Sequence, residues 1–193
     1  MEKKMRVVAG NYKGRRLKAV NGMKTRPTTD KVKESMFNII GPYFDGGHVL
    51  DVFAGSGALG IEAVSRGADH AILIDRSYQA IKTINENVAL TKEPQRFSVV
   101  KGDSFKIINS LAEKQEKFSY VFFDPPYREQ KIVKMIQTLV KLQLLAKNAV
   151  IVCETDQNAH LPVELADFDL LKQVDYGITE LTYYEYNGGE DLK

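Results

Sequence analysis

The feature that most constrains the fold is an alternation of strand-like and helix-like segments through the middle of the chain. Between residues 48 and 154, short apolar runs typical of buried strands alternate with longer segments of helical periodicity. Strands separated by helices predict β-α-β crossovers, and therefore a parallel sheet covered by helices on both faces. The expected strands are 48–54, 71–75, 97–102, 120–124 and 149–154, with helices at 58–66, 78–90, 104–114 and 129–146.

The two ends of the chain follow different patterns. Residues 5–9 and 15–20 predict a short β-hairpin, and a helix is expected to begin near Asp30 and to end before Gly41-Pro42. Residues 169–174 and 178–186 predict an antiparallel hairpin that completes a seven-stranded, mostly parallel α/β sheet. We therefore divide the chain into an amino-terminal hairpin extension and connector (1–29), one α/β domain (30–187) and a tail (188–193).

Composition excludes several classes of protein. The 193 residues are 44% hydrophobic and 27% charged, as in a folded globular domain. Cys153 is the only cysteine, so neither an internal disulfide nor a Cys-x-x-Cys metal site is possible, and the three histidines have no ligand-like spacing. No apolar stretch approaches the roughly 18 residues that span a bilayer, and no signal-peptide core follows the first residues. We expect a cytoplasmic protein without a metal.

Charge is distributed unevenly along the chain. Residues 1–33 contain eleven Lys or Arg and two acidic residues, whereas the remainder contains sixteen basic and twenty-three acidic residues. A basic segment on an acidic body indicates a polyanionic partner, because lysine and arginine release counterions from phosphates. A solvated amino-terminal tail would show the same asymmetry, so charge alone leaves both interpretations open.

A glycine-rich turn follows the first strand of the α/β domain. Gly55, Gly57 and Gly60 match the G-x-G-x-x-G pattern between a strand and a helix, and Asp75 ends the next strand twenty residues after Gly55. An acid at that point can accept hydrogen bonds from ribose hydroxyls. These features suit NAD and S-adenosylmethionine equally. Asp51, on the strand itself, favours a cofactor with an ammonium and a sulfonium over one with a pyrophosphate.

Two further strand ends carry polar residues. Asp103 and Ser104 follow the third strand, where an acid can bind the exocyclic amine of adenine or simply cap the next helix. The fourth strand ends in Asp124-Pro125-Pro126-Tyr127. Two prolines remove two amide donors, so a carboxylate and carbonyl oxygens remain as acceptors for an exocyclic amine, and the tyrosine ring can stack on a planar base. A proline turn without function is the alternative.

The chain resembles a known family over almost its whole length. The motifs that carry the resemblance are 6–10 (RVVAG), 14–17 (GRRL), 26–34 (RPTTDKVKE), 51–60 (DVFAGSGALG) and 124–127 (DPPY). They are similar to those of the bacterial 16S ribosomal RNA guanine-N2 methyltransferases of the D type. The resemblance implies a Rossmann-like class I methyltransferase domain, a monomer, S-adenosylmethionine as cofactor and S-adenosylhomocysteine as product. It implies methylation of one guanine N2 amine in 16S rRNA, in an assembly intermediate of the small ribosomal subunit.

The resemblance also implies roles for individual residues. Asp51, Gly55 and Gly57 would line the methionine part of the cofactor, Asp75 would hold the ribose, and Asp103 with Ser104 would hold the adenine. Phe53, Ala54 and Arg76 complete the expected cofactor site, and Asp124, Pro125, Pro126 and Tyr127 would hold the target base. The basic side chains Arg6, Lys13, Arg15, Arg16 and Arg26 are candidates for RNA phosphate contacts. The segment 26–30 suits either the RNA or the cofactor carboxylate.

Three other functions remain open from the sequence. An adenine-N6 methyltransferase acting on DNA or RNA would need the same Asp-Pro-Pro-Tyr motif. An NAD-dependent oxidoreductase is supported by the glycine pattern alone. A nucleic-acid-binding assembly factor without turnover would explain the basic segment but not the polar residues at three strand ends.

Overall fold

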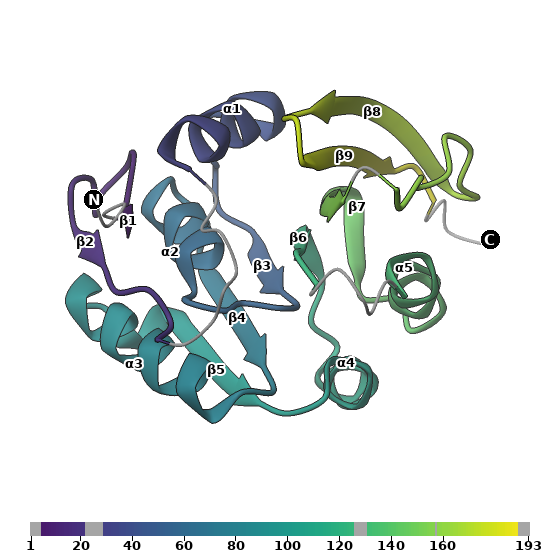
Figure 1. The fold of residues 1–193 in the computed structure, drawn as a ribbon. Coiled ribbons are helices and arrows are strands. Elements are labelled where there is room, and N and C mark those ends of the chain that lie inside the picture. The colour runs from purple at the N-terminus through teal and green to yellow at the C-terminus, as the bar shows by residue number, and fades with distance from the viewer. Residues whose placement is uncertain (1–4, 22–28, 126–130, 157, 189–193) are drawn as a thin grey trace.

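A seven-stranded sheet forms the centre of the protein, in the strand order β5-β4-β3-β6-β7-β9-β8 (Figure 1). The computed structural model describes residues 5–21, 29–125, 131–156 and 158–188. The strands are β3 (His48–Asp51), β4 (His70–Asp75), β5 (Phe97–Lys101), β6 (Phe118–Phe123), β7 (Leu145–Asp156), β8 (Phe168–Asp175) and β9 (Thr179–Tyr186). Strand β9 is antiparallel to both of its neighbours, β7 and β8, and the other adjacent strands of this sheet are parallel. The seven-stranded, mostly parallel sheet with a carboxyl-terminal hairpin is thus confirmed.

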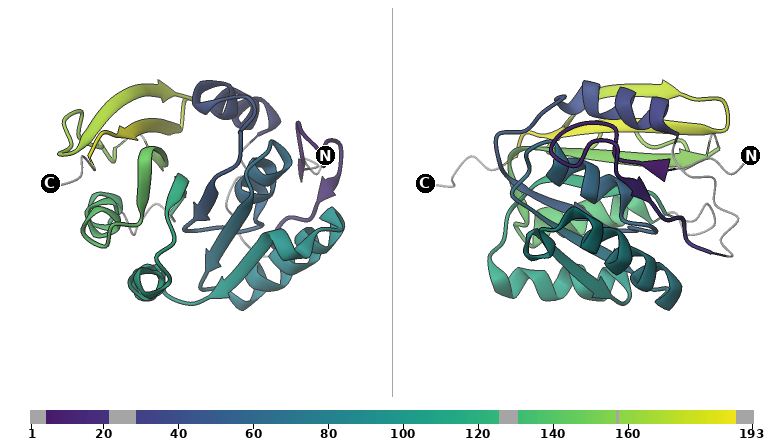
Figure 2. Two further views of the ribbon diagram at one scale, coloured as in Figure 1. Left: turned by 180° about the vertical axis from the view of Figure 1, so that it is seen from behind. Right: turned by 90° about the vertical axis from the view of Figure 1, so that its left-hand side faces the viewer.

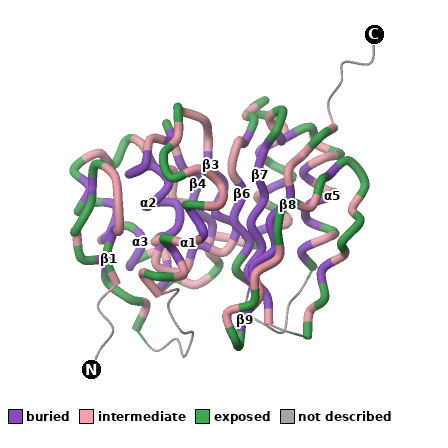
Figure 3. Tube along the Cα trace, turned by 90° about the horizontal axis from the view of Figure 1, so that it is seen from above, coloured by how far each residue is buried: buried purple, intermediate pink, exposed green. Residues whose placement is uncertain are grey.

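Helices cover both faces of the sheet. They are α1 (Asp30–Ile40), α2 (Ala58–Ser65), α3 (Tyr78–Thr91), α4 (Ser104–Leu111) and α5 (Ile132–Lys141), with short 3₁₀ turns at Pro94–Arg96 and Ala112–Lys114. Helices α1, α2 and α3 lie on one face, and α4 and α5 on the other (Figures 1 and 2). Side chains alternate along each strand and therefore form two separate apolar clusters, one beneath each helical layer. The buried strands between the layers are visible from above in Figure 3.

The strand order reverses between β3 and β6. The chain first builds outward from β3 through β4 to β5, and then crosses back to β6 on the other side of β3. In open α/β sheets, ligands bind beyond the carboxyl ends of the strands at such a reversal. A ligand-binding site is therefore expected at the carboxyl ends of β3 and β6.

One predicted helix is too long. The segment 129–146 was expected to be helical throughout, but α5 ends at Lys141, and residues 129 and 130 lie outside the described part. Gln143 has a φ of 55°, and the Leu144 amide donates to the Leu139 carbonyl at 2.9 Å, which closes the helix. Leu144 and Leu145 are buried, and Leu145 begins β7. Two adjacent apolar residues are compatible with a buried helix and with a buried strand, so hydrophobic periodicity does not locate the end of α5.

The amino-terminal hairpin has shorter strands than predicted. Its paired residues are β1 (Met5–Arg6) and β2 (Arg16–Leu17), not 5–9 and 15–20. We call residues 5–21 the arm. In the described structure the arm is not a free tail, because its backbone amides donate hydrogen bonds to side chains of α2 and α3.

A buried glutamate on α2 holds the arm and α1 in place. Glu62 is 0% exposed and accepts hydrogen bonds from the Val8 and Ala9 amides at 2.8 and 2.9 Å. It also forms ion pairs with Lys33 of α1 at 3.0 Å and with Arg66 at 2.9 Å. The Lys33 ammonium donates in addition to the Arg6 carbonyl. Two cations and two amides compensate the buried carboxylate, so three segments far apart in sequence are joined at one point.

Two other buried polar side chains complete the attachment. The Tyr12 amide donates to the Ser65 hydroxyl at 2.9 Å, and that hydroxyl donates to the Ala9 carbonyl at 2.6 Å. Asn87 of α3 accepts from the Lys18 amide at 2.8 Å and donates to the Lys18 carbonyl at 3.0 Å. Side chains of α2 and α3 therefore take the place of a neighbouring strand for the arm backbone.

Two glycines of the arm allow its packing against α2 to be tested by substitution. Gly10 has a φ of +81°, and a Cβ there would lie 1.8 Å from the Ser65 carbonyl oxygen, whereas Gly14 has a φ of +82° with nothing within 4 Å of a Cβ. We expect Gly14→Ala to lower the free energy of unfolding by about 1 kcal/mol, from backbone strain alone. Gly10→Ala should cost about 2–4 kcal/mol, because the overlap with α2 is added. Urea unfolding measures both; equal losses would contradict the observed contact.

Candidate functional site

Four carboxylates lie at the carboxyl ends of four adjacent strands. Asp75 ends β4 and Asp51 ends β3. Asp124 directly follows β6, and Glu154 lies near the end of β7. Asp51 is level with Leu73 on one side and Phe122 on the other, and these neighbours belong to the apolar cluster under α1–α3. Because side chains alternate, Asp75, Asp124 and Glu154 are placed on that same face. The four residues form what we call the acidic row.

Asp51 is buried at the centre of the acidic row. It is 1% exposed; its Oδ2 accepts from the Gly60 amide at 3.2 Å, and its Oδ1 has no partner among the described residues. Burial, and then the nearby charge of Asp75, raises the pKa of Asp51 to about 7, although the Gly60 amide opposes the shift. A buried carboxylate with one free oxygen is suited to a cationic ligand.

The glycine turn between β3 and α2 is held by Asp75. The Gly55 amide donates to Asp75 Oδ2 at 2.9 Å, and the Ser77 amide donates to Asp75 Oδ1 at 2.8 Å. A Cβ on Gly55 would meet nothing within 4 Å, so the turn presents open space there, whereas a Cβ on Gly60 would lie 2.2 Å from Leu73. Gly55 thus leaves room for a ligand, and Gly60 allows α2 to pack closely on β4.

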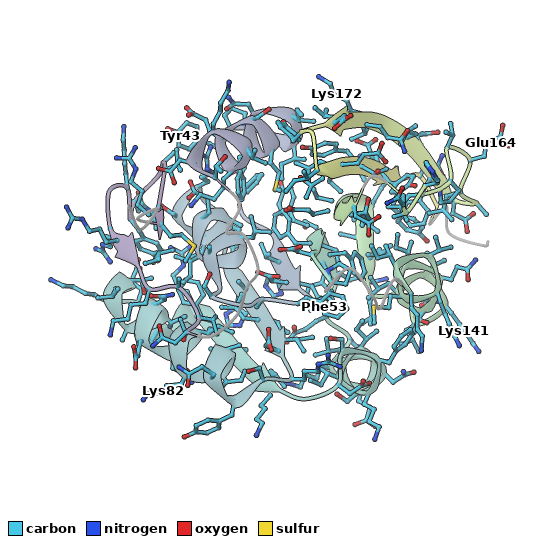
Figure 4. All side chains as sticks on the ribbon, in the orientation of Figure 1. Tyr43, Phe53, Lys82, Lys141, Glu164 and Lys172 are labelled. Atoms are coloured by element: carbon cyan, nitrogen blue, oxygen red, sulfur yellow. The ribbon has the colours of Figure 1, made fainter. Side chains whose placement is uncertain are left out.

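The remaining residues of the expected cofactor site surround this turn. Ala54 and Gly57 are buried, and the Gly57 amide donates to the Ala54 carbonyl at 2.6 Å to close the turn. Phe53 is partly buried and lies near the tip of β3 (Figure 4). Arg76 is exposed just beyond β4. The structure therefore brings these residues together at the end of β3 and β4.

Asp103 and Ser104 make internal contacts. Asp103 is the N-cap of α4, and its Oδ1 accepts from the Lys106 amide at 3.1 Å. The Ser104 hydroxyl is buried and donates to the Val52 carbonyl at 2.8 Å, which ties α4 to the end of β3. The prediction that Asp103 caps a helix is thus confirmed, and its contact with an adenine stays a prediction. Both residues still lie at the carboxyl end of β5, beside the glycine turn.

Asp124 lies across the strand reversal from the glycine turn. The residue is exposed as a whole and Pro125 is buried, while Pro126 and Tyr127 lie outside the described residues. Desolvation of its carboxyl, followed by the nearby charges of Glu154 and Asp51, raises the pKa of Asp124 well above its ordinary value.

Glu154 was missed as a site residue by the sequence analysis. It is 9% exposed on β7, one residue beyond Cys153, which is level with Phe123 of β6. Glu154 is therefore the neighbour of Asp124 across the two strands. The strand that contains it was correctly predicted, so the rule that singled out polar strand ends could have found it.

The basic residues of the arm fall into two groups. Arg6 forms an ion pair with Asp30 at 2.7 Å, and Arg15 donates to the Leu90 carbonyl at 2.5 Å and lies over the Tyr12 ring. Lys13 and Arg16 are exposed, and their side chains make no hydrogen bond or ion pair with the other described residues. Arg26 lies outside the described residues. Thr29 caps α1 by accepting from the Val32 amide at 3.3 Å, so the end of the 26–30 segment starts this helix.

The described residues form neither a metal site nor a membrane-spanning helix. In the ranges 5–21, 29–125, 131–156 and 158–188, no three His, Cys, Asp or Glu side chains converge as a metal site, and the acidic row is spread over four strands. Within the same ranges, none of the helices has both the length and the apolar character that crossing a bilayer requires.

Comparison with known proteins places the chain among methyltransferases. Residues 5–185 match the family described as Conserved hypothetical protein 95. The chain is 45% identical over 184 residues to a Bacillus subtilis protein, YlbH, whose name assigns it provisionally to the rRNA methyltransferases; the match covers 95% of this chain and 100% of that protein. It is 33% identical over 174 residues to ribosomal RNA small subunit methyltransferase D of Escherichia coli, covering 88% of this chain and 83% of the relative.

Solved structures agree with this result. A structure from Escherichia coli, named as a proposed methyltransferase (yhhF), matches with a TM-score of 0.80 and 33% identity over 96% of this chain and 99% of that one. A Haemophilus influenzae structure, named as a proposed methylase (HI0767), matches with a TM-score of 0.76 and 29% identity, covering 96% and 99%. The fold is therefore that of a methyltransferase.

The electrostatics of Asp51 predict a pH-dependent stability. Because the folded-state pKa is raised, the native protein binds more protons than the unfolded chain between about pH 4 and 7, and stability falls as the pH rises through that window. We expect Asp51→Asn to be more stable than the wild type by up to about 3 kcal/mol at pH 8, with the difference shrinking toward pH 4. Urea unfolding at several pH values measures this. The control is Asp169→Asn, at an exposed position. If the difference in unfolding free energy between Asp51→Asn and the wild type did not change with pH, the raised pKa of Asp51 would be contradicted.

Proposed function

Because the chain belongs to the Conserved hypothetical protein 95 family and to the ribosomal RNA small subunit methyltransferases D within it, we propose that it methylates 16S rRNA. The proposed reaction transfers a methyl group from S-adenosylmethionine to the exocyclic N2 amine of one guanine. We propose that it acts as a monomer in the cytoplasm, on an assembly intermediate of the small subunit.

One observation supports this proposal above the others. The acidic row joins a site suited to a cation, at Asp51, to an acceptor suited to an amine, at Asp124, across the reversal between β3 and β6. A methyl donor and a methyl acceptor must lie side by side for direct transfer. Adjacent strand ends provide that arrangement without movement of the domain.

The cofactor fits the residues around the glycine turn. Asp51 offers a buried free oxygen to a positive charge, and Gly55 leaves open backbone where a ligand can approach. Asp75 holds the turn through its hydrogen bonds to Gly55 and Ser77, and the remaining acceptor capacity of its carboxylate is available to ribose hydroxyls. When bound, S-adenosylmethionine supplies a methyl group already activated by a sulfonium.

The protein's main task is then to orient and activate the amine. The lone pair of a guanine amine is delocalised into the ring, so the nitrogen is a weak nucleophile. A hydrogen bond from the amine to Asp124 favours a more pyramidal nitrogen and stabilises the positive charge that develops on it. The Pro125 carbonyl and the Tyr127 ring are proposed to hold the other amine hydrogen and the base face. The base must leave its stack to reach this point.

The arm is proposed to bind the RNA around the target nucleotide. The side chains of Lys13 and Arg16 are exposed and have no partner among the described residues, so their charges are available to phosphates. The buried contacts of Glu62, Ser65 and Asn87 fix the arm on α2 and α3, which gives these charges a defined position relative to the site. Arg6, Arg15 and Arg26 remain candidates for further contacts.

Other functions are less well supported. An adenine-N6 methyltransferase would use the same acceptors and differ only in its product, N6-methyladenine in place of N2-methylguanosine. A dinucleotide cofactor would place a pyrophosphate near the buried Asp51 carboxylate, which is electrostatically unfavourable. A binding protein without turnover would have no use for the acidic row.

The proposed role of Asp124 predicts a selective loss. Asp124→Asn keeps the shape but loses the charge-assisted acceptor, so kcat for methylation of subunits that lack the modification should fall about 100- to 1,000-fold. The Kd for S-adenosylmethionine, measured by calorimetry, should stay within about threefold, because Asp124 lies outside the glycine turn. Asp169→Asn, on the far edge of the sheet, is the control. Loss of cofactor affinity equal to the loss of kcat would move Asp124 into the cofactor site.

The proposed role of the arm predicts a change in salt dependence. Neutralising Lys13 and Arg16 together (Lys13→Gln, Arg16→Gln) should raise the KM for RNA. It should also reduce the slope of the logarithm of the RNA association constant against the logarithm of the salt concentration by about 1.5, since each phosphate contact contributes about 0.7–0.9. Lys141→Gln with Lys147→Gln removes two exposed charges from the opposite side of the protein (Lys141 is labelled in Figure 4) and serves as the control. The same slope in both double variants would exclude the arm as the contact surface.

A further inference from the structure

Asn87 of α3 contacts the arm and the glycine turn at the same time. Its side chain is 0% exposed, and its Oδ1 accepts from the Lys18 amide at 2.8 Å. Its Nδ2 donates to the Lys18 carbonyl at 3.0 Å and to the Ser56 carbonyl at 2.9 Å. A side-chain amide nitrogen carries two hydrogens, so one serves the arm and the other serves the turn. One buried side chain therefore joins the arm to the turn through hydrogen bonds.

Ser56 lies at the middle of the glycine turn, between Gly55 and Gly57. These two glycines have φ values of +54° and +78°, and glycine leaves the backbone free to adopt other conformations. The turn therefore depends on contacts from outside it to keep its shape. Asp75 supplies one contact by accepting from the Gly55 amide at 2.9 Å, and Asn87 supplies another at Ser56.

A second contact joins the arm to the same residue of the turn. The Ser56 hydroxyl donates to Met5 Sδ at 3.6 Å. Met5 is paired with Leu17 across the hairpin of the arm, and Lys18 directly follows Leu17. Both ends of the hairpin thus reach Ser56, one directly and the other through Asn87. The conformation of the turn and the position of the arm are therefore linked.

We propose that Asn87 is a positioning residue that couples cofactor binding to RNA binding. A cofactor bound at the turn fixes the Ser56 peptide group, and Asn87 then fixes the Lys18 backbone of the arm. RNA bound to the arm acts in the opposite direction through the same hydrogen bonds. Each ligand orders a segment that the other would otherwise have to order, so the two ligands bind cooperatively. This proposal rests on the proposed function, in which the arm binds RNA.

The size of the coupling follows from the contacts that transmit it. A hydrogen bond between neutral groups changes an equilibrium by a few-fold to about tenfold, so we expect the cofactor to tighten RNA binding about fivefold. Thermodynamic linkage requires RNA to tighten cofactor binding by the same factor. S-adenosylhomocysteine is the appropriate probe, because it has no methyl group to transfer and the RNA therefore stays unmodified.

The first test is amide hydrogen exchange of the arm in the full-length protein, without RNA. Saturating S-adenosylhomocysteine should slow the exchange of the Val8, Ala9 and Tyr12 amides about fivefold in the wild type. These amides keep their acceptors on α2 in Asn87→Ala, so they still report how firmly the arm is held. In Asn87→Ala the ligand should no longer slow them. An arm that does not respond in the wild type, or still responds in the variant, would overturn the proposal.

The matched control is Ser65→Ala. The Ser65 hydroxyl is also buried and also holds the arm, through the Tyr12 amide and the Ala9 carbonyl. It lies at the last residue of α2, at the opposite end of this helix from the glycine turn. Its loss should speed exchange in the arm with and without the ligand, while the fivefold response to S-adenosylhomocysteine remains. Loss of the response in Ser65→Ala would show that any weakening of the arm abolishes it, which would overturn the role of Asn87.

The second test measures the coupling with RNA. The Kd for small ribosomal subunits that lack the modification would be determined with and without saturating S-adenosylhomocysteine. The ratio of the two Kd values should be about five in the wild type and in Ser65→Ala, and within about 1.5-fold of one in Asn87→Ala. A merely structural role of Asn87 would raise both Kd values and leave their ratio at five, and that result would overturn the proposal.

Failure of the variant to fold and failure of the proposed function are both recognisable. If thermal unfolding shows that Asn87→Ala does not fold, Asn87→Asp replaces it, since it keeps the Oδ1 acceptor for Lys18 and loses the Nδ2 donor to Ser56. The response of the wild-type arm to S-adenosylhomocysteine needs no variant. If the wild type neither binds nor methylates RNA, the proposed function fails, whereas the exchange measurement still decides whether the turn and the arm are coupled through Asn87.

Discussion

The burial of one charge, that of Glu62, organises the part of the molecule that surrounds the site. A fully buried carboxylate is tolerated only when enough donors surround it, and Glu62 collects them from the arm, from α1 and from its own helix. Removing one partner of such a group typically costs about 3–5 kcal/mol. The arm and α1 are therefore fixed to α2, and α2 begins at the glycine turn of the site.

The acidic row follows the opposite electrostatic design. Glu62 is compensated by the protein itself, whereas Asp51 has one free oxygen within the described structure and a pKa raised to about 7. Burial of the Asp51 carboxylate disfavours its charged form, and the free oxygen is suited to a ligand that brings a positive charge. A sulfonium cofactor and a methylated amine, which becomes cationic during the transfer, both have that property.

Much of this architecture could be predicted from the sequence. The alternation of buried strands and helices gave the doubly wound sheet, and strand-end residues such as Asp51, Asp75 and Asp124 could be singled out, because polar residues after apolar strands are locally visible. The strand-end rule also applies to Glu154, which ends a predicted strand but lies in none of the motifs that carry the resemblance. The end of α5 depends on Leu144 and Leu145, whose side chains suit either state, so tertiary packing decides the boundary.

Other features depend on contacts that no local pattern reveals. The docking of the arm rests on pairs such as Val8 with Glu62 and Lys18 with Asn87, which are 54 and 69 residues apart. A glutamate or an asparagine inside a helix predicts a solvated face, and here both side chains are 0% exposed. The same limit applies to the hydrogen bond from the Ser104 hydroxyl to the Val52 carbonyl, which joins residues 52 positions apart; the expected role of Ser104 at the cofactor stays a prediction.

The most direct test of the account is the identity of the methylated nucleoside. Purified protein, methyl-labelled S-adenosylmethionine and small ribosomal subunits from cells that lack this gene would be incubated together, and the RNA would be digested and separated by chromatography. The account predicts label in N2-methylguanosine. Label in a methylated adenine would retain the fold and the acceptor chemistry but contradict the guanine target, and no label in subunits, free RNA or DNA would contradict the proposed activity.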